Sequence, residues 1–104
     1  MKYVFGYHGG GGMPEGEADV AAEMAKWEAW FGSLGAAVVD GGAPFSMART
    51  VAADGSVSDG GGTNPLTGYS IVEADSLDAA VEMARGCPVL SSGGSVEVAE
   101  SIDM

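Results

Sequence analysis

Residues 59–88, DGGGTNPLTGYSIVEADSLDAAVEMARGCP, place a loop, a strand and a helix in an order that decides the fold. The glycines at the start predict a loop, and Thr67 to Ala74 forms a short β run. Asp75 to Asp78 resembles a capping box, with Asp75 or Ser76 as the N-cap of a helix. This helix should end before Cys87-Pro88, because proline cannot continue it. Four of its residues are expected to face inward: Leu77, Ala80, Val81 and Ala84.

The chain before this stretch predicts a strand, a helix and a second strand. Residues 2–8 alternate, so that three aromatic side chains share one face and His8 lies on the other. The helix that follows is marked by an apolar stripe at three- and four-residue spacing, and Gly35 ends it as a left-handed cap. The stripe consists of Val20, Met24, Trp27, Phe31 and Leu34. Ala36 to Asp40 then predicts a second short strand.

A hairpin and a last strand complete the order of elements. Arg49 to Ala52 and Ser56 to Ser58 flank Asp54-Gly55, a strong signal for a two-residue hairpin turn, and Ser95 to Ser101 supplies the last strand. The order predicts one α+β domain over residues 1–104, with the ferredoxin-like βαββαβ arrangement and an inserted β-hairpin. Two helices cover only one face of such a sheet. We therefore expect a homodimer whose open sheet faces pack together as a dimeric α+β barrel.

The charge and the cysteine content exclude several classes of function. The net charge is -11 and the chain has only four lysines and arginines, too few for the basic face that nucleic acid or an anionic membrane requires. Neither is expected as a partner. Cys87 is the single cysteine, so no intrachain disulfide can form. The N-terminal apolar run stops at Gly6, too short for a signal peptide core, and we expect a cytoplasmic protein.

Motifs along the whole chain resemble the YCII-related family, in the branch labelled DGPF after a loop motif. They are YVFGYHGGG at the start, WEAWFGSLG in the first helix, VVDGG after it, VSDG before the glycine loop, LTGYSIVEADSLDAAVEMA and GCP further on, and SVEV near the end. The resemblance implies a dimeric α+β barrel of ferredoxin-like subunits. Relatives include a dehydrochlorinase-like enzyme.

Two departures limit what the resemblance implies about residues. Asp59-Gly60-Gly61-Gly62 stands where the family motif has Asp-Gly-Pro-Phe, so the aromatic ring of that motif is missing. Family members with proposed catalysis use a His and an Asp in the barrel cleft. Their His belongs to the first helix region, whereas His8 ends the first strand, so that role does not carry over to His8.

His8 is nevertheless the first candidate for chemistry, because it is the only imidazole in the chain. The alternation points it into the expected dimer cleft, where Gly6, Gly68 and Ser70 would leave room for a small organic ligand. There His8 would act as a general acid/base. The alternative is a hydrogen-bonded histidine with a structural role.

Three carboxylates could orient His8: Asp40, Asp59 and Glu73. We expect the first and third main strands to run parallel, which places Glu73 near His8 and Asp40 at the far end. Asp59 would reach His8 through its loop or from the partner subunit. Arg49, on the hairpin, would bind a carboxylate of the ligand or pair with a surface acid.

The remaining motifs are less informative. The Gly9–Gly12 run could cradle a phosphate, but it lacks the motifs of known phosphate loops and acidic residues follow it. No metal site and no cofactor are expected from one His and one Cys. Trp27, Trp30 and Phe31 are core residues or, alternatively, an aromatic ligand wall. Two functions stay open: a dimeric module that binds a small organic ligand, and a cofactor-free lyase or isomerase that uses His8.

Overall fold

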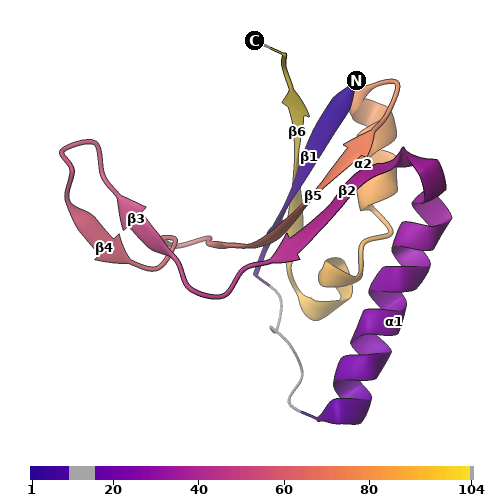
Figure 1. The fold of residues 1–104 in the computed structure, drawn as a ribbon, viewed down its shortest axis with the longest axis horizontal. Helices are drawn as coiled ribbons and strands as arrows, with labels where there is room; N and C mark the ends of the chain where they lie inside the picture. The colour runs from indigo at the N-terminus through magenta and orange to yellow at the C-terminus, as the bar shows by residue number, and fades with distance from the viewer. Residues whose placement is uncertain (10–15, 104) are drawn as a thin grey trace.

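The computed structural model describes residues 1–9 and 16–103 (Figure 1). Its elements, in chain order, are β1 (Lys2–His8), α1 (Glu17–Leu34), the 3-10 turn η1 (Gly35–Ala37), β2 (Val38–Pro44), β3 (Arg49–Val51), β4 (Val57–Asp59), β5 (Leu66–Glu73), α2 (Leu77–Ala84), η2 (Pro88–Ser92) and β6 (Ser95–Ser101). The phosphate cradle considered for Gly9–Gly12 falls, from residue 10 on, outside the described residues.

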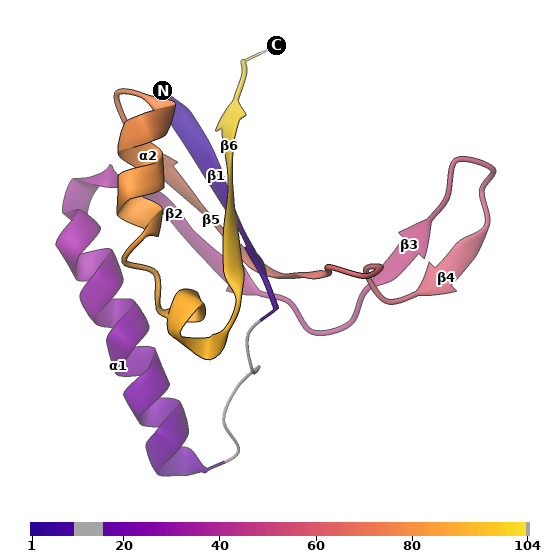
Figure 2. The ribbon, with the colours of Figure 1, turned by 180° about the vertical axis from the view of Figure 1, so that it is seen from behind.

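The main sheet has the strand order β2-β5-β1-β6, and each neighbouring pair is antiparallel. Both helices cover the same face of this sheet, and within residues 1–9 and 16–103 no helix lies on the other face (Figures 1 and 2). This is the ferredoxin-like α+β arrangement that the order of elements predicted. The inserted hairpin is confirmed as a separate two-stranded sheet of β3 and β4.

The direction of β5 corrects one expectation, because β5 runs antiparallel to β1. Lys2 pairs with Glu73 and His8 pairs with Leu66, so Glu73 lies at the end of the sheet away from His8. Asp40 lies opposite Ile71, near the middle of β5. The reason is topological: the crossover through α1 makes β2 parallel to β1, and β5 between them runs the opposite way. Glu73 instead accepts a 2.6 Å hydrogen bond from the N-terminal ammonium group, which lowers its pKa.

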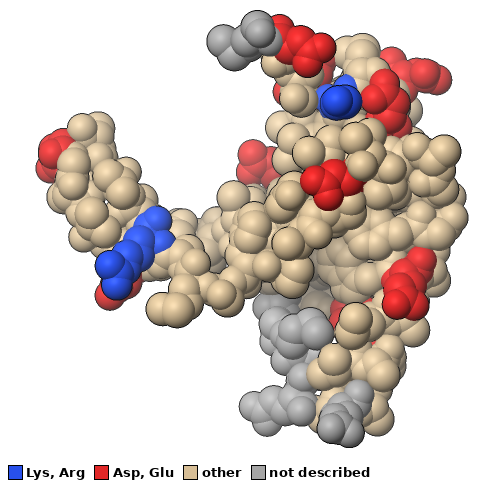
Figure 3. Space-filling view, in the orientation of Figure 1, with Lys and Arg blue, Asp and Glu red and all other residues tan. Residues whose placement is uncertain are grey.

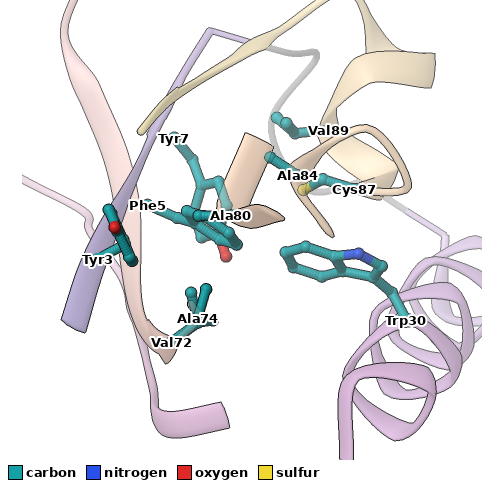
Figure 4. Packing of buried hydrophobic residues seen from close by; sticks show 10 residues of the cluster. All are labelled: Tyr3, Phe5, Tyr7, Trp30, Val72, Ala74, Ala80, Ala84, Cys87 and Val89. Carbon is teal, nitrogen blue, oxygen red and sulfur yellow. The ribbon is translucent and has the colours of Figure 1, made fainter. Parts of the chain in front are cut away.

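The core lies between the sheet and the helices (Figure 4). Tyr3, Phe5 and Tyr7 are all buried on the helix-covered face, as the alternation predicted. Trp30 of α1 is 6% exposed, and its ring stacks on Phe5 with the centroids 6.0 Å apart. Val72 of β5 completes the centre of this cluster.

The second helix begins as predicted but turns a different face inward. The Ser76 hydroxyl caps it by accepting a hydrogen bond from the Ala79 amide at 3.1 Å. Ala80 is buried, whereas Leu77 and Val81 are 47% and 36% exposed. The expectation for these two residues was wrong because α2 packs on β1 and β6 through its alanine face.

The first helix also differs from its predicted stripe. Trp30, outside the stripe, is the buried residue, and Met24, inside it, is 52% exposed. Met24 is exposed because it borders a cavity rather than the packed core.

The hairpin extends away from the rest of the molecule (Figures 1 and 2). Arg49 pairs with Asp59 and Val51 with Val57 across β3 and β4. The hairpin is where it was predicted, but its loop has three residues, 53–55, rather than the two of Asp54-Gly55, because the Ala52 amide donates a hydrogen bond to the Ser56 carbonyl oxygen and Gly55 takes a φ of +89°. We call residues 49–59 the arm.

Candidate functional site

A cavity of about 520 Å³ lies on the helix-covered side of the sheet, between α1 and the edge formed by β2 and β5. Small-molecule sites in proteins commonly measure about 300–1,000 Å³. The rim on β2 depends on Gly42, whose φ is +74° and where a Cβ would collide with the carbonyl oxygen of Tyr69. Only glycine lets β2 approach β5 so closely at this point.

Aromatic rings form the walls of the cavity. Tyr7 and Trp27 meet edge to face, with ring centroids 5.0 Å apart, and Phe31 lies 6.1 Å from Trp27. On the opposite rim Phe45 stacks on Tyr69 at 5.9 Å. The cluster on α1 therefore divides: Trp30 belongs to the core, and Trp27 and Phe31, both half-buried, line the cavity.

Two buried hydroxyls at the cavity are already paired within the protein. The Tyr7 hydroxyl donates to Ser70 Oγ at 2.7 Å, and Ser70 donates to the Gly41 carbonyl oxygen at 2.8 Å. Burial raises the pKa of Tyr7, so its phenol stays neutral at physiological pH. Neither hydroxyl has a proton left for a ligand, and the Tyr7 and Ser70 side of the cavity offers mainly apolar contact.

The charged groups at the cavity are carboxylates. Glu23 and Glu28 of α1 line it, and no Lys or Arg is among the described lining residues. The side chain of Glu23 is 17% exposed; its Oε1 accepts a 3.2 Å hydrogen bond from Trp27 Nε1, and its Oε2 lies 3.7 Å from Nζ of Lys26. Acidic groups also predominate over basic ones on the face in Figure 3. This field disfavours an anionic ligand.

His8 lies on the open face of the sheet, outside the lining of this cavity, and is 8% exposed. Its Nδ1 is 2.9 Å from the Asn64 carbonyl oxygen, and its Nε2 is 3.2 Å from Glu97 Oε1. Both partner atoms are hydrogen-bond acceptors. His8 thus links the loop before β5 to β6.

The expected ligand residues do not surround His8. Gly68 pairs with Tyr7, and Ser70 with Phe5, so both lie on the helix-covered face. Gly6 shares the open face with His8, but a Cβ at Gly6 would meet Leu66 Cδ2 at 2.9 Å, so Leu66 covers this position. The antiparallel register explains the separation: His8 is on one side of the sheet, and Gly68 and Ser70 line the cavity on the other.

Arg49 and Asp59 lie together on the arm, which extends away from the main sheet that contains β1 (Figure 1). Arg49 Nε is 3.6 Å from Asp59 Oδ1, and the two side chains are 72% and 97% exposed. This geometry corresponds to the surface pair that was one of the two expectations for Arg49. Such a pair contributes little to stability.

Sequence reasoning missed Glu97 and Glu23. Glu97 lies opposite Gly6 on β6, so an antiparallel last strand would have placed it on the face of His8. Glu23 precedes Trp27 by four residues, a spacing that brings two side chains together on a helix. Cys87 is buried, and burial raises its pKa to about 11, which suits a small core residue rather than a nucleophile.

Within the described residues, no helix has the length and apolar character needed to cross a membrane. Searches among curated proteins and among solved structures returned no significant match. The family model of the YCII-related domain matches residues 1–104, the whole chain. The chain therefore belongs to the YCII-related family.

Proposed function

We propose that this protein is a dimeric module that binds a small organic ligand in the cavity between α1 and the β2–β5 edge. The observation that carries the proposal is the cavity of about 520 Å³ with aromatic walls on a rigid sheet. Trp27 and Phe31 would stack on the ligand. The site thus differs from the cleft between two sheets that the sequence suggested.

The homodimer is supported by the open face of the sheet. Val4, Ile71 and Leu66 share this face, and Leu66 is 49% exposed. A second copy of the same face would bury these apolar side chains. The single, buried Cys87 supports a reducing compartment such as the cytoplasm.

A second candidate is the cofactor-free lyase or isomerase, and the pair of His8 and Glu97 is what favours it. A buried imidazole beside a carboxylate can hold and donate a proton. However, Nδ1 faces the Asn64 carbonyl oxygen and Nε2 faces Glu97, so both ring nitrogens are engaged within the chain and neither lines the cavity. The binding module is therefore the better supported function.

Binding of N-phenyl-1-naphthylamine, a neutral probe that fluoresces in apolar sites, tests the cavity. We expect saturable binding of one probe per chain. Trp27→Leu keeps an apolar side chain but removes the aromatic face, so the dissociation constant should rise about tenfold. Circular dichroism checks that the variant is folded.

His8→Gln is the matched control because His8 lies on the other face of the sheet. We expect this variant to bind the probe as the wild type does. The cavity proposal fails if the probe does not saturate any site, or if folded His8→Gln loses binding while Trp27→Leu keeps it. The second of these results would favour the His8 site instead.

A further inference from the structure

The cavity combines aromatic faces with carboxylates on a single wall. Trp27 and Phe31 supply the rings; Glu23 precedes Trp27 by about one turn of α1, and Glu28 precedes Phe31 by about one turn. Aromatic faces attract cations through the ring quadrupole, and carboxylates attract them through charge. Both features therefore favour a ligand that carries a positive charge.

The position of Glu23 places this preference for a cation at the cavity itself. Its side chain is only 17% exposed, and the hydrogen bond from Trp27 Nε1 holds Oε1 at the aromatic wall. A carboxylate that is partly removed from water attracts a cation more strongly than an exposed one does. The protein's own cation at this place, Lys26, is 3.7 Å from Oε2 and 59% exposed, so it is a loose surface partner.

The rest of the lining does not offset this preference. The protons of Tyr7 and Ser70 are used within the protein, and no described lining residue is basic. A carboxylate or phosphate on a ligand would find no cationic side chain among the described lining residues. From these observations we infer that the cavity takes an aromatic or similarly apolar molecule that carries a cationic amine, with the ammonium group beside Glu23. This inference rests on the proposed function and specifies its ligand class.

Three matched probes test the inference: 2-(1-naphthyl)ethylamine, 2-(1-naphthyl)ethanol and 1-naphthaleneacetate. They share one ring system and differ in the charge of the end group. Isothermal titration calorimetry at pH 7 and low salt should give the amine about tenfold tighter binding than the alcohol, and the carboxylate the weakest binding. The advantage of the amine should shrink as salt is added.

Two double variants with the same change in net charge locate the effect. Glu23→Gln with Glu28→Gln removes the carboxylates of the cavity, and a glutamine at position 23 can still accept the Trp27 hydrogen bond. This variant should bind the amine and the alcohol about equally. Glu82→Gln with Glu100→Gln alters exposed residues that do not line the cavity, and it should keep the preference for the amine.

The possible results separate the inference from the proposed function. If the alcohol binds as tightly as the amine to the wild type, or if the preference survives removal of both cavity carboxylates, the inference is wrong while the binding module stands. If neither the naphthyl compounds nor N-phenyl-1-naphthylamine binds, the proposed function itself is wrong.

Discussion

Ser70 shows how the face on which a single residue lies decides its role. Its hydroxyl is fully buried, accepts a hydrogen bond from Tyr7 and donates one to the Gly41 carbonyl oxygen. These two bonds join β1, β5 and β2 on the helix-covered side. The neighbouring Tyr69 points the other way and donates to Asp40 at 3.3 Å. One step along β5 thus separates a buried link between strands on the helix-covered face from a side chain on the open face.

Cys87 leads to a prediction about alkaline pH. Its folded pKa of about 11 exceeds the ordinary value of 9.0 because burial disfavours the thiolate. The native state therefore binds the thiol proton of Cys87 more tightly than the unfolded state does. The contribution of this proton to the free energy of unfolding is complete below pH 9 and is lost as the pH rises toward 11. Cys87→Ala should be about 1 kcal/mol less stable than the wild type at pH 7. This difference should shrink at pH 10.5 when both proteins are unfolded with urea.

A difference between the two proteins that is the same at pH 7 and pH 10.5 would contradict this prediction. Burial raises the pKa of Tyr7 as well, and Cys87 adds a smaller increase. The burial contribution is common to both proteins, so the comparison reports Cys87 together with its minor effect on Tyr7.

At the scale of elements, local sequence patterns predicted which segments form strands and helices. The topology of the sheet determines which side chains of those segments lie next to one another. The alternation in β1, the cap at Ser76 and the hairpin around Asp54-Gly55 are local signals, and all three are confirmed, although the hairpin loop is one residue longer than the two-residue turn predicted. The direction of β5 is set by the crossover through α1, which a local reading missed. Because of that error Glu73 was expected beside His8, whereas the carboxylate at His8 is Glu97 of β6.

The cavity could be predicted only in part for the same reason. The aromatic cluster on α1 was visible as a candidate ligand wall, because its members repeat at helical spacing. The opposite rim depends on a bulge in β2 between Asp40 and Ala43. No periodic pattern encodes that bulge, although the pair Gly41-Gly42 is its local sign.

Gly42→Ala tests whether the bulge in β2 requires a glycine at this position. The φ of +74° disfavours an L side chain, and the new Cβ would collide with the Tyr69 carbonyl oxygen. We expect a loss of about 2 kcal/mol or more in the free energy of unfolding, measured with urea. Gly41→Ala is the matched control, since nothing lies within 4 Å of a Cβ there and its φ is not positive. Equal stability of the two variants would show that the bulge does not require glycine.

At the scale of the whole molecule, the chain is flat and extended for its length. Its extents are 43 × 42 × 19 Å and its radius of gyration is 14.8 Å, against about 13 Å for a compact chain of 100 residues. The arm and the open sheet face account for this shape (Figures 1 and 2). A hairpin of two strands is only marginally stable alone. Contact with a second copy of the chain would stabilise the arm and cover the open sheet face.

Ile71→Lys tests the proposed homodimer, because Ile71 pairs with Val4 on the open face and is half-buried in one chain. A lysine there would be buried without a partner between two sheets, which costs several kcal/mol and should dissociate the dimer. Light scattering coupled to size exclusion should give twice 10.4 kDa for the wild type and 10.4 kDa for the variant. Leu77→Lys on α2, 47% exposed on the opposite side, should stay dimeric. Leu66→Lys, at a more exposed position of the open face, repeats the test if Ile71→Lys does not fold. A wild-type mass of 10.4 kDa, or dimers that persist in both folded open-face variants, would refute association through this face.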